Sequence, residues 1–140
     1  MLRITVALLL VGFASAQAQT QWSREILLGR WYSESIENAH AKRQVISDRH
    51  ADGSYSIESR IYEGCVLKQR GTETGTWQFD GKVYVKHVLT ISGAAVDYTY
   101  TYEFTELTDR AMRYWHRESD YKSSALKVDA QFQFPGCAIS

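Results

Sequence analysis

The chain has 140 residues, and its 16 Lys and Arg balance its 16 Asp and Glu, so there is no formal net charge. Such a balance lacks the basic stripe that a phosphate backbone requires, so nucleic acid is not expected as a partner. Aromatic residues make up 13% of the chain, whereas Pro135 is the single proline. Long β-strands favour aromatic side chains and exclude proline from central positions, so the composition predicts a β-protein.

Residues 1–18 have the organisation of a secretory signal peptide. Arg3 supplies a positive n-region, residues 4–13 form an apolar h-region, and residues 14–16 or 16–18 offer a small-residue cleavage site. A transmembrane anchor needs about 20 apolar residues, and Gln17 and Gln19 interrupt the run well before that. We therefore expect cleavage, a secreted or periplasmic protein without a stable membrane anchor, and one domain over residues 19–140.

A single helical turn is expected ahead of the first strand. Ser23 is suited to cap residues 23–28, with Trp22 and Ile26 packing across the turn. Eight segments with β character follow, and Asp52-Gly53 and Asp80-Gly81 predict type I′ hairpin turns between two pairs of them. The segments are 30–37, 43–50, 54–63, 72–79, 82–91, 96–107, 111–119 and 125–134. Their order and short connections predict an all-β protein, an eight-stranded antiparallel up-and-down barrel.

Alternation of apolar and polar residues indicates the buried face of four of these segments. The residues predicted to face inward, segment by segment, are Tyr55, Ile57 and Ile61; Val83, Val85, His87, Leu89 and Ile91; Val96, Tyr98, Tyr100, Tyr102 and Phe104; and Leu126, Val128, Ala130, Phe132 and Phe134.

Cys65 and Cys137 are the two cysteines of the chain. In an oxidising compartment an isolated pair readily forms a disulfide, which would close a loop of roughly 70 residues and stabilise the fold by about 4 kcal/mol. The alternative is a free reactive thiol, for which neither cysteine has a neighbouring His or a CxxC partner.

Gly29-Arg30-Trp31 at the start of the first strand, the eight ordered strands, and a Cys after the third strand with another near the C-terminus resemble the lipocalin or calycin superfamily. Thr108-Asp109-Arg110 partly matches a second motif of that family, Thr-Asp-Tyr. The resemblance is to a minimal bacterial-type lipocalin-like domain. It implies that Gly29 and Trp31 are structural, with the Trp31 ring turned inward to close the base of the barrel. The last segment has no Arg to stack on that ring.

The candidate ligand-binding residues are side chains that could reach the lumen of such a barrel. Tyrosines combine apolar walls with hydroxyls that orient a ligand, although the same rings could instead fill the narrow interior completely. The four histidines show no metal-ligand spacing, so no metal or other cofactor is expected. The lumen candidates are Tyr55, Tyr84, Tyr98, Tyr100, Tyr102, Tyr114, His87 and His116.

These observations favour a protein that binds a small apolar or aromatic molecule in the barrel. One alternative is a periplasmic inhibitor or interaction protein that presents residues 19–24, including Trp22. Another is a calycin-type enzyme with polar residues in the lumen, although no Ser elbow or phosphate loop assigns a catalytic residue. The residues considered for that chemistry are Tyr98, Tyr100, Glu58, Arg60 and Arg113.

Overall fold

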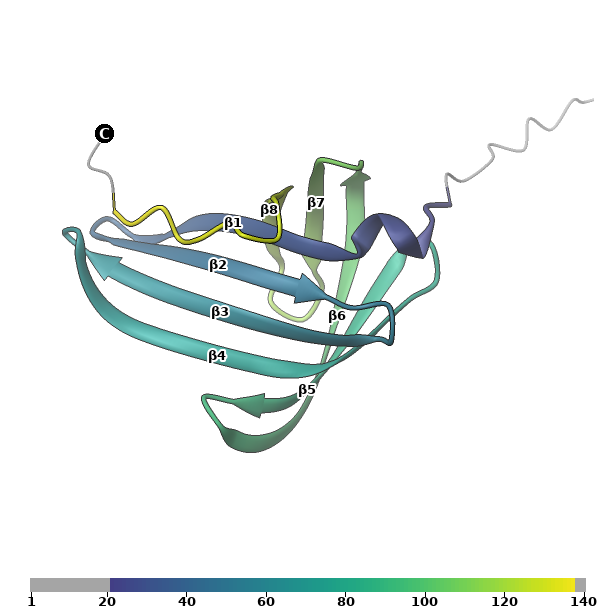
Figure 1. The fold of residues 1–140 in the computed structure, drawn as a ribbon, viewed down its shortest axis with the longest axis horizontal. Coiled ribbons are helices and arrows are strands. Elements are labelled where there is room, and N and C mark those ends of the chain that lie inside the picture. The colour runs from purple at the N-terminus through teal and green to yellow at the C-terminus, as the bar shows by residue number, and fades with distance from the viewer. Residues whose placement is uncertain (1–20, 138–140) are drawn as a thin grey trace, which may run out of the picture.

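The computed structural model describes residues 21–137, which form a closed antiparallel barrel with the strands in sequence order (Figure 1). This confirms the predicted fold, while the expected signal peptide lies outside the described residues. Within the described part, no helix is long and apolar enough to cross a membrane. The strands are β1 (Gly29–Asn38), β2 (Ala41–Arg49), β3 (Ser54–Glu63), β4 (Val66–Phe79), β5 (Val83–Ile91), β6 (Ala94–Leu107), β7 (Ala111–His116) and β8 (Tyr121–Lys127).

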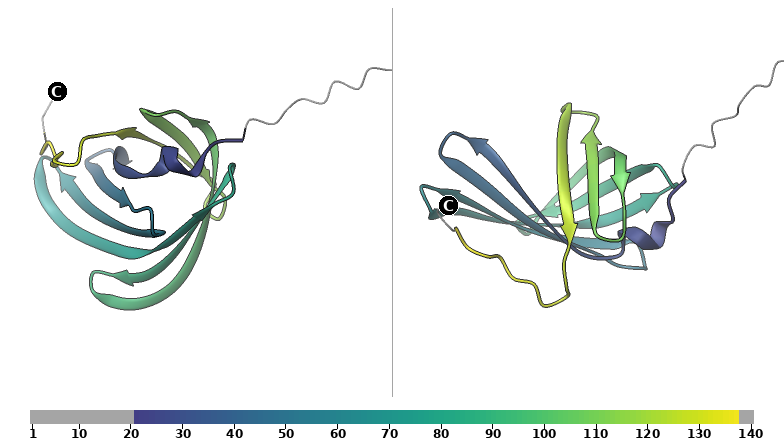
Figure 2. Two further views of the ribbon diagram at one scale, coloured as in Figure 1. Left: turned by 45° about the vertical axis from the view of Figure 1, so that its right-hand side comes forward. Right: turned by 90° about the horizontal axis from the view of Figure 1, so that it is seen from above.

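The barrel is closed at one end by a short helical turn, as the sequence predicts. The 3-10 helix η1 (Arg24–Leu27) has Ser23 as its N-cap and lies across the ring of strands in the left view of Figure 2. Leu27 is completely buried, and Trp22 and Ile26 pack against the same core. The Trp22 backbone N–H donates to the Gly81 carbonyl at 3.0 Å, which fixes the N-terminal segment to the β4–β5 connection.

Trp31 lies at the centre of this closed end. It follows Gly29, whose φ of +91° is a conformation that favours glycine. The Trp31 side chain is 1% exposed, and its indole N–H donates to the Leu27 carbonyl at 3.0 Å. Lys127 of β8 places its ammonium 5.0 Å from the centre of the ring. A lysine therefore stacks on Trp31 where the last segment offers no arginine.

The tight hairpin turns differ from those predicted. Neither Asp52 nor Asp80 has a positive φ, so these Asp-Gly pairs do not form type I′ turns. Instead, Asp80 Oδ1 accepts hydrogen bonds from the backbone N–H groups two and three residues later, at 2.9 and 2.7 Å. The two-residue turns with positive φ at both positions are Gly64-Cys65 and Ser92-Gly93.

Strand β8 corrects the predicted last strand, because it spans Tyr121–Lys127 rather than residues 125–134. Ala125 faces the core opposite Met112, whereas Leu126 is 59% exposed. Because successive side chains of a strand point to opposite faces, the residues in phase with Ala125 face inward and those in phase with Leu126 do not. The predicted inward face of the last segment, which began at Leu126, was therefore wrong.

Residues 128–137 form a tail outside the barrel, which runs from β8 towards the β3–β4 turn (Figure 2, right). The Phe132 ring lies 5.1 Å from the Tyr32 ring, and the Phe132 carbonyl accepts a hydrogen bond from Arg30 Nε. The Phe134 ring lies under the Arg60 guanidinium, at 4.3 Å. Both phenylalanines thus pack on the outer wall instead of in the lumen.

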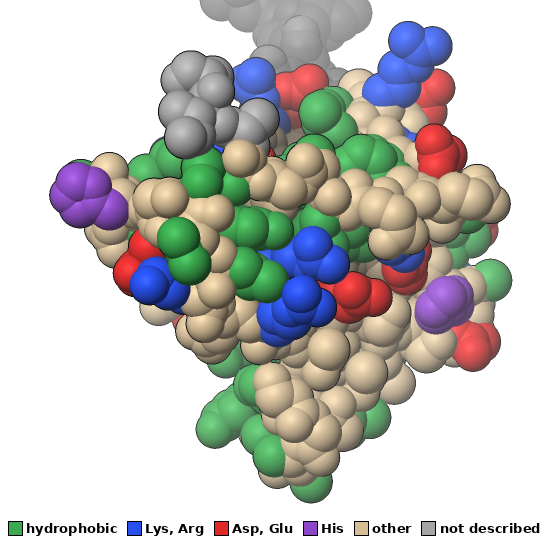
Figure 3. Space-filling model, turned by 60° about the vertical axis from the view of Figure 1, so that its left-hand side comes forward, with side chains coloured by type: hydrophobic (Ala, Val, Ile, Leu, Met, Phe, Trp, Pro, Cys, Tyr) green, Lys and Arg blue, Asp and Glu red, His purple; other side chains and the backbone are tan. Residues whose placement is uncertain are grey.

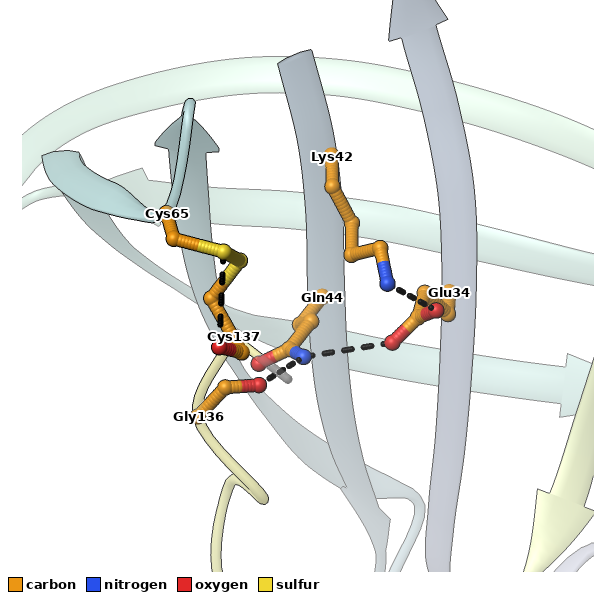
Figure 4. The surroundings of a disulfide bond; sticks show 6 residues. All are labelled: Glu34, Lys42, Gln44, Cys65, Gly136 and Cys137. Atoms are coloured by element: carbon orange, nitrogen blue, oxygen red, sulfur yellow. Dashed lines mark hydrogen bonds and ion pairs between the residues drawn. A yellow bond between two sulfur atoms is a disulfide. The ribbon is translucent and has the colours of Figure 1, made fainter. Parts of the chain in front are cut away.

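The predicted disulfide between Cys65 and Cys137 is present, with a Cα–Cα distance of 5.1 Å. It fixes the tail to the β3–β4 turn. Beside it, Gln44 Nε2 donates to the Gly136 carbonyl at 2.8 Å and to Glu34 at 3.2 Å (Figure 4). Gln44 is only 1% exposed although it lies on the outer face of β2, so the tail covers this part of the wall.

Candidate functional site

The barrel holds a cavity of about 550 Å³ that is open to the surface, and its lining side chains come from all eight strands. Along each strand the lining residues follow the alternation of a β-strand, as Ser33, Ser35 and Glu37 do on β1. The volume falls within the range of about 300 to 1,000 Å³ that is typical of small-molecule sites. Of the two possibilities that the sequence leaves open, the structure therefore shows the hollow barrel.

Six of the eight lumen candidates line this cavity, and two do not. His87 lies on the outer face, with Nε2 2.6 Å from Asp97 Oδ1. Tyr98 is 50% exposed on the projecting part of β6, beyond the cavity wall. The candidates that the fold brings together are Tyr55, Tyr84, Tyr100, Tyr102, Tyr114 and His116.

Strand register explains why His87 faces outward. Tyr84 pairs with Tyr102 and Lys86 pairs with Tyr100 across the β5–β6 ladder, and directly opposite residues share one face of a sheet. The inner face of β5 is therefore Tyr84, Lys86 and Val88, all nearly buried. The predicted inner face of Val83, Val85, His87, Leu89 and Ile91 was wrong.

Aromatic rings form one continuous wall of the cavity. The Tyr102 ring lies 5.8 Å from Tyr84, 5.5 Å from Tyr114 and 4.8 Å from His116. Phe104 continues the wall, with its ring centre 6.2 Å from the ring centres of Tyr84 and Tyr114. A flat apolar molecule could stack or make edge contacts with several of these rings at once.

A largely buried ion pair lies beside this wall. Lys86 is 7% exposed, and its ammonium lies 2.7 Å from Glu73 Oε1, which also accepts a hydrogen bond from the Tyr55 hydroxyl at 2.8 Å. The same ammonium lies between 5.3 and 5.7 Å from the ring centres of Tyr55, Tyr100 and Tyr102. Sequence reasoning missed Glu73 and Lys86 because it searched the lumen for apolar positions.

Two tyrosine hydroxyls of the cavity are held in the protonated form. Burial raises the pKa of Tyr55 well above its usual range, and the hydrogen bond to Glu73 adds to this effect. Burial likewise raises the pKa of Tyr102, with a further contribution from the neighbouring Tyr114. Both hydroxyls are therefore hydrogen-bond donors at neutral pH.

This protonation predicts a loss of stability in alkali. In the unfolded chain these tyrosines ionise near pH 10, whereas the folded protein retains their protons. Their contribution to the free energy of unfolding is therefore complete below about pH 10 and decreases above it, by up to about 1.4 kcal/mol per pH unit for each tyrosine. Urea unfolding at several alkaline pH values should show a shallower decline for Tyr55→Phe than for the wild type. Tyr98→Phe is the exposed control, and equal slopes in all three proteins would contradict the prediction.

Of the residues considered for the enzyme alternative, Tyr100 lines the cavity and the others do not. Glu58 is exposed, Arg60 covers Phe134 on the outer wall, and the Arg113 side chain is 71% exposed. Within the described residues there is also no group of three His, Cys, Asp or Glu side chains that could hold a metal ion.

Trp22, which the inhibitor alternative places in a presented segment, packs against the core.

The eight-stranded closed barrel is consistent with a lipocalin-like fold. Comparison with known proteins adds no relative, since no family model matches the chain and no curated protein or solved structure shows significant similarity to it.

Proposed function

We propose that this chain is a lipocalin-like binding protein of a secreted or periplasmic compartment, which holds a small aromatic or apolar molecule inside its barrel. The observation that carries the proposal is the cavity of about 550 Å³ at the centre of the closed sheet. The disulfide between Cys65 and Cys137 supports an oxidising compartment.

The chemistry of the lining supports a ligand that has both an apolar body and polar atoms. Tyr84, Tyr102, Tyr114 and Phe104 offer ring faces and edges, while the hydroxyls of Ser33 and other serines offer hydrogen bonds. Binding sites generally obtain affinity from such apolar walls and orientation from a few polar groups.

A neutral fluorescent probe tests this proposal. N-phenylnaphthylamine should bind the wild-type protein with increased fluorescence, and Tyr100→Ala should weaken its affinity by about threefold to tenfold because one ring of the cavity is lost. Tyr98→Ala is the matched control, since Tyr98 lies two residues away on the same strand but does not line the cavity. Absence of probe binding, or an equal loss of affinity in both variants, would contradict binding in the lumen.

A second candidate function, binding to a protein partner, is favoured by the β5–β6 hairpin. This hairpin projects from the barrel at the bottom of Figure 1, and hydrophobic side chains lie on the same projection in Figure 3. Leu89, Ile91 and Tyr98 are 43%, 39% and 50% exposed there. A photo-crosslinking residue at position 91 should capture one defined protein in the native host if this function is correct. The same residue at exposed position 113 should not capture it.

A further inference from the structure

Arg49 occupies a distinctive position in the cavity. It ends β2 at the closed end of the barrel, where it pairs with Gly29 and Tyr55 of the neighbouring strands. Its Nε donates to the Tyr84 hydroxyl at 3.2 Å, and its guanidinium lies 4.9 Å from the centre of the Tyr84 ring. No other hydrogen bond to the guanidinium occurs within the described residues, and Nη1 is buried without a partner.

The other cations of the cavity wall are paired. Lys86 contacts Glu73 at 2.7 Å, and Arg43, at the opposite end of β2, lies 3.8 Å from Glu37. Among the described residues, Arg49 is the lining cation with no carboxylate within 4.0 Å. Burying Nη1 without an acceptor is costly, because its N–H donors have lost water without gaining a hydrogen-bond partner.

A second cation lies near Arg49. Lys127 lies close by, and its pKa is lowered by burial and then by the charge of Arg49, while Asp109 acts in the opposite direction. The Lys127 ammonium already donates to the Leu28 carbonyl. Arg49 thus lines the cavity with a second cation near it at the closed end of the barrel, and the lining carboxylates Glu37 and Glu73 are paired with Arg43 and Lys86.

We propose that Arg49 is an anion-binding subsite and that the ligand is an aromatic or apolar molecule with one anionic group, such as a carboxylate, sulfonate or phosphate. The inference rests on the proposed function and adds the ligand's charge and orientation. The anionic group lies against Arg49 at the closed end, and the apolar body extends along the wall of Tyr102 and Tyr114 towards the open end. A guanidinium presents two parallel donors to such groups, which gives both affinity and alignment.

Two probes with one skeleton test the subsite. Anilinonaphthalene sulfonate is N-phenylnaphthylamine with an added sulfonate, so the pair isolates the contribution of the negative charge. Fluorescence titration gives both dissociation constants for the wild type, Arg49→Gln and Arg49→Lys. Arg113→Gln is the matched control, because it removes the same charge from an exposed position on the outer wall.

Arg49→Gln should weaken binding of the sulfonate by about tenfold to one hundredfold, the range for loss of a charge-assisted hydrogen bond, and should change binding of the neutral probe by less than about twofold. Arg49→Lys should retain part of the affinity, and Arg113→Gln should retain all of it. Unchanged binding of the neutral probe also shows that the variant is folded with its cavity intact.

Other outcomes separate the two proposals. If the neutral probe binds the wild type but the sulfonate is insensitive to Arg49, the anion subsite is wrong and the binding function stands. Equal losses for both probes would show that Arg49 only supports the packing of the cavity, which also overturns the subsite. If neither probe binds the wild type, the binding function fails and the subsite fails with it.

Discussion

Replacing Trp31 with alanine should lower the free energy of unfolding by about 3 to 5 kcal/mol, the range for truncating a large buried aromatic side chain. Trp31 is 1% exposed, and its removal would leave a cavity among Leu27, Met112 and the other side chains of the core. It would also remove the hydrogen bond to the Leu27 carbonyl, which fixes η1 across the end of the barrel. Urea unfolding followed by circular dichroism measures the loss.

Trp115 provides the comparison for this experiment. It lies on the outer face of β7, is only partly buried, and donates its indole N–H to Asp120 near the β7–β8 turn. Trp115→Ala should therefore lower the free energy of unfolding by clearly less than Trp31→Ala. A loss below about 1 kcal/mol for Trp31→Ala would show that the Gly-x-Trp tripeptide at residues 29–31 does not anchor the closed end.

The fold was largely predictable because the sequence contains strong local signals. The alternation of Tyr100, Tyr102 and Phe104 with polar residues identifies both the strand and its inner face, and β6 has that orientation. Ser23 is the N-cap of η1, and Gly29 has the positive φ at the first residue of β1. The order of eight strands with short connections then leaves an up-and-down barrel as the simplest arrangement.

The inner faces of β5 and β8 were not predictable in the same way. In both strands apolar residues lie on the outer face as well as on the inner one. The prediction, however, took apolar residues as the mark of the inner face. The wall of a ligand cavity can also contain polar side chains where these pair with one another, as Lys86 does with Glu73. Only the register with β6, which places Lys86 opposite Tyr100, determines the orientation.

Arg49 was missed for a related reason. In the sequence it is one of several charged residues near the end of a strand, and nothing local distinguishes it from Asp48 beside it. Asp48 pairs with Arg30 on the outer face, whereas Arg49 faces the cavity. The alternation of β2 did not resolve this, because the adjacent apolar residues Val45 and Ile46 lie on opposite faces, and only Val45 shares the face of Arg49.

Removing the disulfide with Cys65→Ala and Cys137→Ala should lower the free energy of unfolding by about 4 kcal/mol. The sequence separation is 72 residues, and a cross-link that closes a loop of this length restricts the unfolded chain by about that amount in the chain-entropy model. For a domain of this size, the melting temperature should decrease by more than about 10 °C.

The tail contacts allow this effect to be separated from damage to the binding site. Without the disulfide, residues 128–137 are held to the outer wall by noncovalent contacts alone, namely Phe132 with Tyr32 and Arg30, Phe134 with Arg60, and the Gln44 hydrogen bond to Gly136. Hydrogen exchange at Val128, whose N–H donates to the Arg30 carbonyl, should therefore become faster in the double variant. The cavity lies on the opposite face of β1 and β2, so binding of the neutral probe well below the melting temperature should be preserved. A double variant with wild-type stability would contradict the stabilising role of the bridge, and loss of probe binding in a folded variant would show that the tail also shapes the cavity.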